Sequence, residues 1–297
     1  MKKFRIGYFA DGPWSHLAFE KLIEDSSIEI SFIVPRTDTS DKTLLGFAEK
    51  YSIDYLTPVK INSEDFYNKA LGYDCDLFVS MSFNQIFRKR IIEVPRLTTI
   101  NCHAGKLPFY RGRNILNWAL INDEKEFGIT VHYIDEGIDT GDIIRQECFA
   151  ITDHDDYNTL LERAYQACAD LLAQSVEELR TCKAKRLSQQ DFHPLGFYCS
   201  ARGSGDERLN WNQPSRQIFN FVRAICPPGP SARCYLGSSE IKINKVEFLL
   251  DAPSYIGIPG AVLAKNEHSF LVKTSDSYVR VLAWEADENI KVGDRLI

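Results

Sequence analysis

The sequence predicts an α/β protein with a doubly wound, mostly parallel sheet in its first domain and a smaller, β-rich, barrel-like second domain. Apolar strands alternate with amphipathic helices through the first half of the chain, the pattern of a parallel sheet covered by helices. Around 183–214 polar and turn-forming residues take over, and short alternating runs follow. We therefore predict a first domain over 1–199 and a second over 200–297.

The strands of the first domain are predicted from apolar runs, and its helices from apolar residues recurring every three or four positions. Strands are expected at 4–10, 28–34, 76–82, 97–103, 128–134 and 141–151. Helices are expected at 14–26, 42–52, 84–94 and 113–123, and from about 155 to 179 with Thr152 or Asp153 as its N-cap.

The second domain is predicted to begin with one helix and to continue as a small barrel or sandwich. The helix is expected at 215–225, and the strands at 242–249, 260–266, 269–275 and 278–284.

Composition and charge limit the classes of function. The 297 residues carry a net charge of −6, which argues against a general nucleic-acid surface but leaves room for a local cluster that binds a small anion. The eight cysteines form no CxxC pair, so neither a zinc site nor a redox motif is predicted, and we expect no metal. The loop "ADGPWS" after the first strand lacks G-x-G-x-x-G, and a nicotinamide site is not predicted.

The start "MKKFRIGYFADG" has a short apolar run that Asp11 and Gly12 interrupt, so it is interpreted as a strand and not as a signal peptide. No segment approaches the roughly 20 apolar residues of a membrane span. We expect a cytoplasmic protein without a membrane partner.

The stretch "NCHAGKLPFYRGRN" (101–114) stands out because it follows a buried strand. Residues i and i+2 of a strand point to one face, so Asn101 and His103 project together from its carboxyl end, where open α/β sheets bind ligands. Ordinary turn chemistry is the alternative interpretation.

A third candidate, Asp139, lies 139 − 101 = 38 residues after Asn101 in the loop "IDEGIDTGD". An amide N–H and an imidazole can stabilise the oxyanion that forms on a carbonyl, and the imidazole can take a proton from an attacking amine. A carboxylate can set the tautomer of that imidazole. The three residues together predict acyl transfer without a covalent intermediate.

These stretches resemble the formyltransferases that use 10-formyltetrahydrofolate. In that family an Asn-x-His pair and a later Asp form the catalytic set, and the matching residues are Asn101, His103 and Asp139. The match is clearest over about 75–150 and resumes at 210–232 in "NWNQPSRQIFNFVRAICPPGPSA". The resemblance implies a Rossmann-like catalytic core and an appended C-terminal domain.

The resemblance also implies a site for the folate. The stretch "MSFNQIF" (81–87) corresponds to the segment that holds the pterin ring, together with the loop "DEGID" (135–139). Core packing is the alternative role for the two apolar side chains. The implied cofactor-binding residues are Phe83, Asn84, Ile86, Asp135 and Gly137.

Acceptors differ within the family. The tRNA enzymes usually have "HxSLLP", whereas this chain has "HAGKLP", and residues 200–297 hold 12 Lys and Arg against 11 Asp and Glu, little charge for a polyanion. The stretch "GKLPFYRGRNILNWALI" is similar to the enzymes that formylate nucleotide-linked deoxyamino sugars for lipopolysaccharide O-antigens and other surface glycans. The implied partners are a nucleotide sugar and folate, without nucleic acid.

Cationic and amide groups are the candidates for holding this acceptor, because they supply charge-assisted donors to a diphosphate and contacts to sugar hydroxyls. Two arginines at the start of a helix need a reason, since cations are unfavourable there. The candidate substrate-binding residues are Lys106, Arg111, Arg113, Asn114 and Arg223.

Two other functions stay open at this stage. The chain could be a methionyl-tRNA formyltransferase, or a non-catalytic module that binds folate or a nucleotide. A homodimer also stays open.

Overall fold

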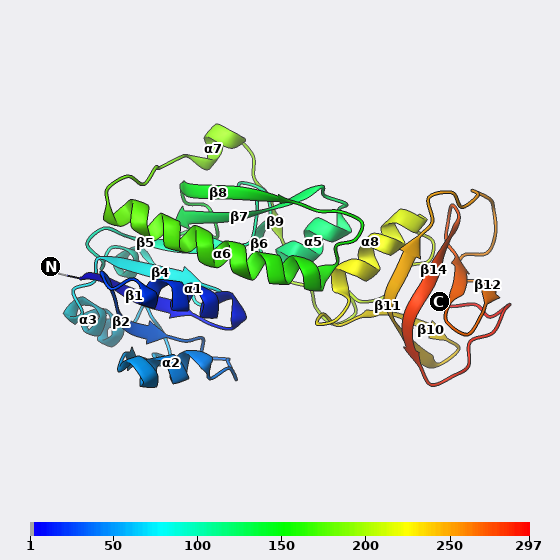
Figure 1. The fold of residues 1–297 in the computed structure, drawn as a ribbon, viewed down its shortest axis with the longest axis horizontal. Coiled ribbons are helices and arrows are strands. Elements are labelled where there is room, and N and C mark those ends of the chain that lie inside the picture. The colour runs from blue at the N-terminus through cyan, green and yellow to red at the C-terminus, as the bar shows by residue number, and fades with distance from the viewer. Residues whose placement is uncertain (1–2) are drawn as a thin grey trace. The chain divides into compact units, whose positions relative to one another are not determined.

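The computed structural model describes residues 3–297, which form two compact units (Figure 1). Among the described residues, the first unit comprises 3–112, 127–149 and 162–199, and the second comprises 113–126, 150–161 and 200–297. One division between the units falls at 199/200, the position of the predicted boundary, and the continuous domain 1–199 stays a prediction. Residues 113–126 and 150–161 also group with the second unit. The helix at 115–121 packs beside the helix at 215–225.

A seven-stranded sheet forms the centre of the first unit, in the order β3-β2-β1-β4-β5-β7-β8. The first five of these strands pair in parallel, and β5 pairs with β7 in antiparallel orientation. This confirms the predicted doubly wound, mostly parallel sheet. The strands are β1 (Phe4–Ala10), β2 (Ile28–Val34), β3 (Asp54–Tyr55), β4 (Leu77–Met81), β5 (Thr98–His103), β7 (Glu126–Tyr133) and β8 (Ile143–Ala150).

Helices cover the sheet on both faces, as the side-chain alternation of the central strand requires. Tyr8 of β1 points to one face, where its ring meets Phe19 of α1 (5.8 Å between centroids), and Phe9 points to the other, against Phe66 of α3 (5.9 Å). The helices α1 and α6 run along one face (Figure 1). The helices of this part are α1 (Pro13–Glu24), α2 (Thr43–Tyr51), α3 (Glu64–Gly72), α4 (Lys89–Ile92), α6 (Tyr157–Arg180) and α7 (Gln189–Phe192).

The helix predicted at 84–94 is wrong for most of its length, because only α4 is helical there. Hydrogen bonds with Ile61 and Asn62 hold residues 85–88 in another conformation. Gln85 Oε1 accepts from the N–H of Ile61, Asn62 Nδ2 donates to the carbonyl of Ile86, and Asn62 Oδ1 accepts from Arg88 N–H. These tertiary hydrogen bonds outweigh the helical spacing of the apolar residues.

Two further differences concern helix starts. The N-cap of α6 is Asp156, which exchanges two hydrogen bonds with Thr159 (2.9 and 3.0 Å), and neither Thr152 nor Asp153. We assigned no element to 53–75, where α3 begins at the cap Ser63, whose side chain accepts from the N–H of Phe66.

The second unit holds α5 (Ile115–Ile121), α8 (Ser215–Ile225) and a five-stranded antiparallel sheet in the order β10-β11-β14-β13-β12. The strands are β10 (Ala232–Leu236), β11 (Ser239–Phe248), β12 (Val262–Lys265), β13 (Phe270–Lys273) and β14 (Tyr278–Ala286). β10 lies where no strand was predicted.

The last residues of the chain close this sheet into a barrel. Tyr235 of the edge strand β10 exchanges two backbone hydrogen bonds with Ile297, while Leu296 donates to Gly260 next to the opposite edge strand, β12. Both edges therefore find backbone partners, which removes the exposed edges of the sheet.

No helix between residues 3 and 297 is both long enough and apolar enough to span a membrane.

Candidate active site

The pair Asn101 and His103 lies at the carboxyl end of β5, as predicted. His103 is 8% exposed, and its Nε2 lies 2.7 Å from the carbonyl oxygen of Tyr110. Its Nδ1 lies 3.6 Å from Oδ2 of Asp139. Both ring nitrogens therefore face oxygen atoms, one of a backbone carbonyl and one of a carboxylate.

Gly105 permits this placement of His103. A Cβ atom at position 105 would lie 2.3 Å from His103 Nε2 and 2.5 Å from the carbonyl oxygen of Tyr110. Any side chain there would therefore separate the imidazole from the carbonyl that holds it.

The carboxylate of Asp139 is the third member that the structure brings to this place. Its side chain is 12% exposed, and its Oδ2 accepts a hydrogen bond from the N–H of Gly112 (2.9 Å). Burial alone would raise the pKa of Asp139. Attraction to His103 and His132 and the hydrogen bond from the Gly112 N–H together hold that pKa below the usual aspartate range.

His132 of β7 belongs to the same cluster, and the sequence analysis missed it. It pairs with Asn101 across β5 and β7, and its Nε2 lies 3.1 Å from Asn101 Nδ2 and 3.5 Å from Asp139 Oδ1. Its Nδ1 faces the carbonyl of Tyr133 at 2.8 Å, so in the neutral ring Nε2 accepts from the Asn101 amide and orients it. The sequence feature that could have indicated His132 is its position as a polar residue inside the apolar run "GITVHYI".

The residues predicted to bind the cofactor lie in two loops of the first unit. Phe83 packs against Phe9 and Phe87 (5.7 and 5.9 Å between ring centroids), as a residue of the core does. The side chain of Ile86 is 48% exposed, so Ile86 is not a core residue. Asn84 Nδ2 donates to Asp38.

In the second loop Asp135 and Gly137 are exposed, and Asp135 Oδ1 accepts from the N–H of Gly137. Ile134, just before this loop, packs on the same apolar cluster as Phe83 of the first loop. One cluster thus supports both predicted loops.

Two buried polar atoms test whether the first loop fits a folate. Asn84 Oδ1 and Gln85 Nε2 have no hydrogen-bond partner in the part of the chain that the structure describes. Buried polar groups are rarely left unpaired. An acceptor and a donor on successive residues fit the edge of a pterin ring, which presents both kinds of group.

The residues predicted to bind the acceptor lie in different surroundings. Arg111 donates through Nε and Nη2 to Gln189 Oε1 (3.2 and 2.6 Å). Arg113 is exposed, and Lys106 is half-buried. The Oδ1 atom of Asn114 accepts from the N–H of Arg202 (2.9 Å).

Arg223 is 6% exposed and serves the interior of the second unit. Its Nη1 donates to the carbonyl oxygens of Thr152 and Asp155, and its Nε donates to Asn220. These bonds occupy the guanidinium with structural partners, so Arg223 is not part of the acceptor site that we propose.

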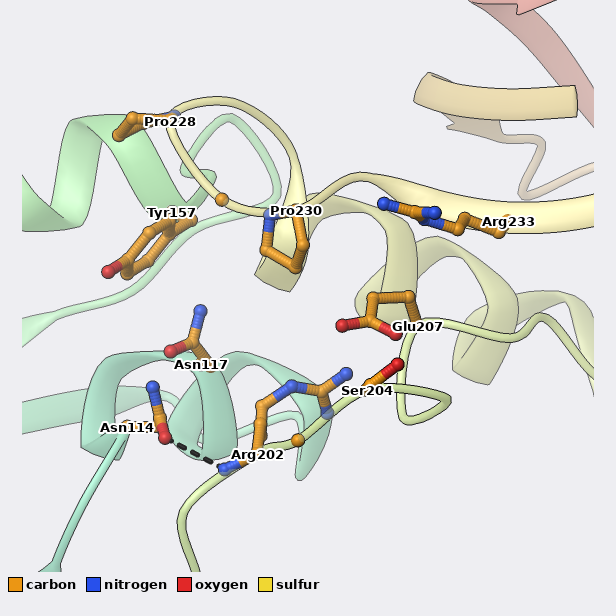
Figure 2. A pocket seen from close by; sticks show the side chains of 11 residues that line it. Asn114, Asn117, Tyr157, Arg202, Ser204, Glu207, Pro228, Pro230 and Arg233 are labelled. Carbon is orange, nitrogen blue, oxygen red and sulfur yellow. Dashed lines mark hydrogen bonds between the residues drawn. The ribbon is translucent and has the colours of Figure 1, made fainter.

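A pocket of about 470 Å³ lies within the second unit (Figure 2). Arg202 and Arg233 extend toward it from different segments, and Asn117 and Glu207 add polar side chains. The complete lining is Asn114, Asn117, Tyr157, Arg202, Gly203, Ser204, Glu207, Pro228, Gly229, Pro230 and Arg233.

The side chains from residue 3 onward include no group of three or more His, Cys, Asp or Glu that could hold a metal ion.

An amide, an imidazole and a carboxylate meeting at the end of a doubly wound sheet define an enzyme of the acyl-transfer class. The model of the formyl transferase family matches residues 30–176, and the model of the formyl transferase C-terminal domain matches 204–292. The methionyl-tRNA formyltransferase of Pelotomaculum thermopropionicum is 32% identical over 251 residues, which is 84% of this chain and 79% of that protein. The chain belongs to the formyltransferase family and is a formyl-transfer enzyme.

Two solved structures share the fold at lower identity. One is WlaRD, a sugar 3N-formyltransferase crystallised with dTDP and 5-N-formyl-THF (20% identity, TM-score 0.70, 98% of this chain and 100% of that chain). The other is an N-formyltransferase from Helicobacter canadensis in complex with folinic acid and dTDP-3-aminofucose (20%, TM-score 0.69, 96% and 100%).

Proposed function

We propose that this enzyme transfers the formyl group of 10-formyltetrahydrofolate to the amino group of a nucleotide-linked deoxyamino sugar, of the kind used in lipopolysaccharide O-antigens and other surface glycans. The observation that carries the choice of acceptor is the pocket of the second unit. Its volume, about 470 Å³, suits a small molecule, and two guanidinium groups line it.

Arg202 is the better placed of the two arginines to meet a phosphate. Its guanidinium lies near the rings of Trp118 and Phe221 (5.6 and 5.4 Å to the centroids), and burial lowers its pKa. A charge that has lost part of its water gains more from an anion than a fully hydrated one does. The Nε atom of Arg233 is buried without a partner among the described residues, so a ligand acceptor would satisfy it.

The remaining polar groups suit the sugars of such a ligand. Asn117 is 4% exposed yet lines the pocket, and the carboxylate of Glu207 can accept hydrogen bonds from hydroxyl groups. Asn114, which also lines it, is two residues after Gly112, whose N–H binds the Asp139 carboxylate.

The catalytic roles follow from the geometry of the first unit. The folate supplies the formyl carbon when bound. Asn101, oriented by His132, points an N–H at the negative charge that develops on the formyl oxygen, and His103 stabilises it with a second N–H. The amine nitrogen forms a bond to the formyl carbon, and a neutral His103 takes the proton of that amine, after which the protonated ring can donate to the oxyanion. The bond between the formyl carbon and N10 of the folate then breaks, His103 returns the proton to N10, and tetrahydrofolate leaves. The ionised Asp139 balances the charge that His103 carries between these steps. The 3.6 Å between His103 and Asp139 exceeds a hydrogen bond, and such contacts commonly shorten when substrates bind.

A thermal-shift panel of dTDP, UDP and their amino sugars tests the proposal. A nucleotide present at 100 times its dissociation constant should stabilise the protein by about 2.7 kcal/mol. The melting temperature could instead stay unchanged with every nucleotide while methionyl-tRNA binds tightly in a gel-shift assay. That result would contradict the nucleotide sugar as acceptor and favour methionyl-tRNA.

Methionyl-tRNA is the second candidate acceptor, because the sequence relatives that match at 30–33% identity are named for it. Binding of tRNA would weaken steeply with salt, since phosphate contacts release counterions. Measuring the gel shift at two salt concentrations therefore separates it from a nucleotide sugar.

The pocket arginines give a specific prediction. We expect Arg202→Met and Arg233→Met each to raise the KM for the nucleotide sugar by roughly 10- to 100-fold and to change kcat little, since a remote phosphate contact is the same in ground and transition states. Arg208→Met is the matched control, because Arg208 is exposed and does not line the pocket. If all three variants had the same KM for the nucleotide sugar, the phosphates would not bind to Arg202 and Arg233.

The folate loop gives another prediction. Asn84→Leu removes the buried acceptor Oδ1 and is expected to raise the KM for 10-formyltetrahydrofolate by about 10-fold, the effect of one lost hydrogen bond. Asn68→Leu on exposed α3 is the control. Calorimetry with a non-hydrolysable folate analogue checks it, and unchanged affinity would remove Asn84 from the cofactor site.

A further inference from the structure

Gln189, the first residue of α7, is a buried amide that neither family model covers. It is 4% exposed, and the models match 30–176 and 204–292. The segment before it is fixed to the start of β8, because Leu187 and Ile143 exchange two backbone hydrogen bonds (2.7 and 2.9 Å).

The amide of Gln189 makes four hydrogen bonds, which is unusual for one side chain. Its Nε2 donates to the carbonyl oxygens of Asp139 and Gly141, both at 2.8 Å. Its Oε1 accepts from Nε and Nη2 of Arg111 (3.2 and 2.6 Å). The partners settle the orientation of the amide, because carbonyls only accept and a guanidinium only donates.

These bonds close a ring around the Asp139 carboxylate. Its Oδ2 is held by the N–H of Gly112. Gly112 is joined covalently to Arg111, whose guanidinium binds Gln189, and Gln189 returns to the backbone of Asp139. The carboxylate is thus fixed at one end through Gly112 and at the other through its own main chain.

Asp139 needs such support because its backbone is in the left-handed region, with φ of +54°. Aspartate adopts this conformation more readily than most residues, and contacts with its surroundings offset the remaining cost. Within the loop itself, Asp135 Oδ1 binds the N–H of Gly137 and the hydroxyl of Thr140, but no contact of this kind reaches the Asp139 carbonyl.

We propose that Gln189 is a positioning residue that, together with Arg111, fixes the Asp139 carboxylate opposite His103. This inference rests on the catalytic set proposed above and not on the identity of the acceptor. It also assigns the Nε and Nη2 donors of Arg111 to the architecture of the site instead of to a phosphate.

Two substitutions distinguish the hydrogen bonds that Gln189 accepts from Arg111 from those that it donates to the carbonyls of Asp139 and Gly141. Gln189→Leu keeps the approximate volume and loses all four hydrogen bonds. Gln189→Glu keeps an acceptor for Arg111 but places carboxylate oxygens against the carbonyls of Asp139 and Gly141, where only a donor fits. Gln190→Leu is the matched control, since Gln190 is exposed on the same short helix.

Carbon-13 NMR of the aspartate carboxyl groups gives a readout that needs no substrate. In the parent protein the Asp139 signal should show no titration step between about pH 3 and 6, because its pKa lies below the usual value. In Gln189→Leu and Gln189→Glu the carboxylate moves away from His103, its pKa rises, and a step should enter this window. Gln190→Leu should behave like the parent.

Kinetics with 10-formyltetrahydrofolate and dTDP-3-aminofucose give the second readout. A displacement near 1 Å is expected to lower kcat by about 100-fold in both Gln189 variants, with KM values within about twofold of the parent. In an Asp139→Asn background, Gln189→Leu should have almost no further effect, since it acts through Asp139.

The proposal would be overturned if both Gln189 variants kept the Asp139 titration and the turnover of the parent. It would also be overturned if Gln189→Leu lowered kcat in the Asp139→Asn background by as much as it does in the parent. If Gln189→Leu does not fold, Gln189→Glu decides alone. If the parent turns over no nucleotide sugar, the proposed acceptor fails, and the NMR titration still tests Gln189.

Discussion

Replacing His103 by alanine is expected to lower the turnover number by about 10³-fold at saturating folate and acceptor. The substitution removes the base that takes the amine proton and one donor to the developing oxyanion. Asn101→Ala removes the other donor and should lower turnover by about 10²–10³-fold. Both residues lie at the carboxyl end of β5. The melting temperature of each variant separates a loss of catalysis from a loss of folding.

Residues that act as a unit have non-additive effects, which sharpens this test. Asp139→Ala should act largely through His103, so the double variant His103→Ala/Asp139→Ala should be little worse than His103→Ala alone. His154→Ala is the control, since His154 is exposed and outside the site. Near-normal turnover in the single variants, or loss of activity that only follows unfolding, would contradict the assignment.

The second large effect concerns stability. Gly260→Ala is expected to lower the free energy of unfolding by about 3 kcal/mol, because two penalties coincide. The φ angle of Gly260 is +86°, and a Cβ atom there would lie 2.0 Å from the carbonyl oxygen of Leu296. The hydrogen bond from Leu296 N–H to Gly260, part of the closure of the barrel, could not survive the shift.

Two other glycines separate the penalties. Gly237 has φ of +61°, but a Cβ atom added there would have no other atom within 4 Å, so Gly237→Ala should cost about 1 kcal/mol from backbone strain alone. Gly46 lies in α2 in open space with no such strain, and Gly46→Ala should stabilise by about 0.5–1 kcal/mol. Chemical denaturation measures all three, and equal effects at 260 and 237 would show that the contact with Leu296 is harmless.

Local patterns were enough for most of the architecture. The period of apolar residues identified β1, β2, β4 and β5, and predicted α8 at its observed bounds, Ser215–Ile225. The same alternation placed Asn101 and His103 on one strand end, because residues two apart on a strand share a face whatever surrounds them.

These local patterns did not predict which distant segments pair. His132 lies next to Asn101 only because β7 joins β5 in one antiparallel register, and a sequence pattern does not specify register between strands about 30 residues apart. The apolar residues of 84–88 have the spacing of a helix. Hydrogen bonds with Ile61 and Asn62 nevertheless hold this segment in a non-helical conformation.

The roles of the arginines were also decided by the tertiary structure. From the sequence, Arg111 and Arg223 were both candidates to bind a phosphate. In the fold, the buried amide of Gln189 accepts from two donors of Arg111, and two backbone carbonyls accept from Nη1 of Arg223. The sequence by itself determined which strand end carries Asn101 and His103, the pair that we propose as catalytic, because that position depends on local periodicity. Only the tertiary structure decided what each charged side chain binds, because a long side chain pairs with whatever acceptor the packing brings within about 3 Å.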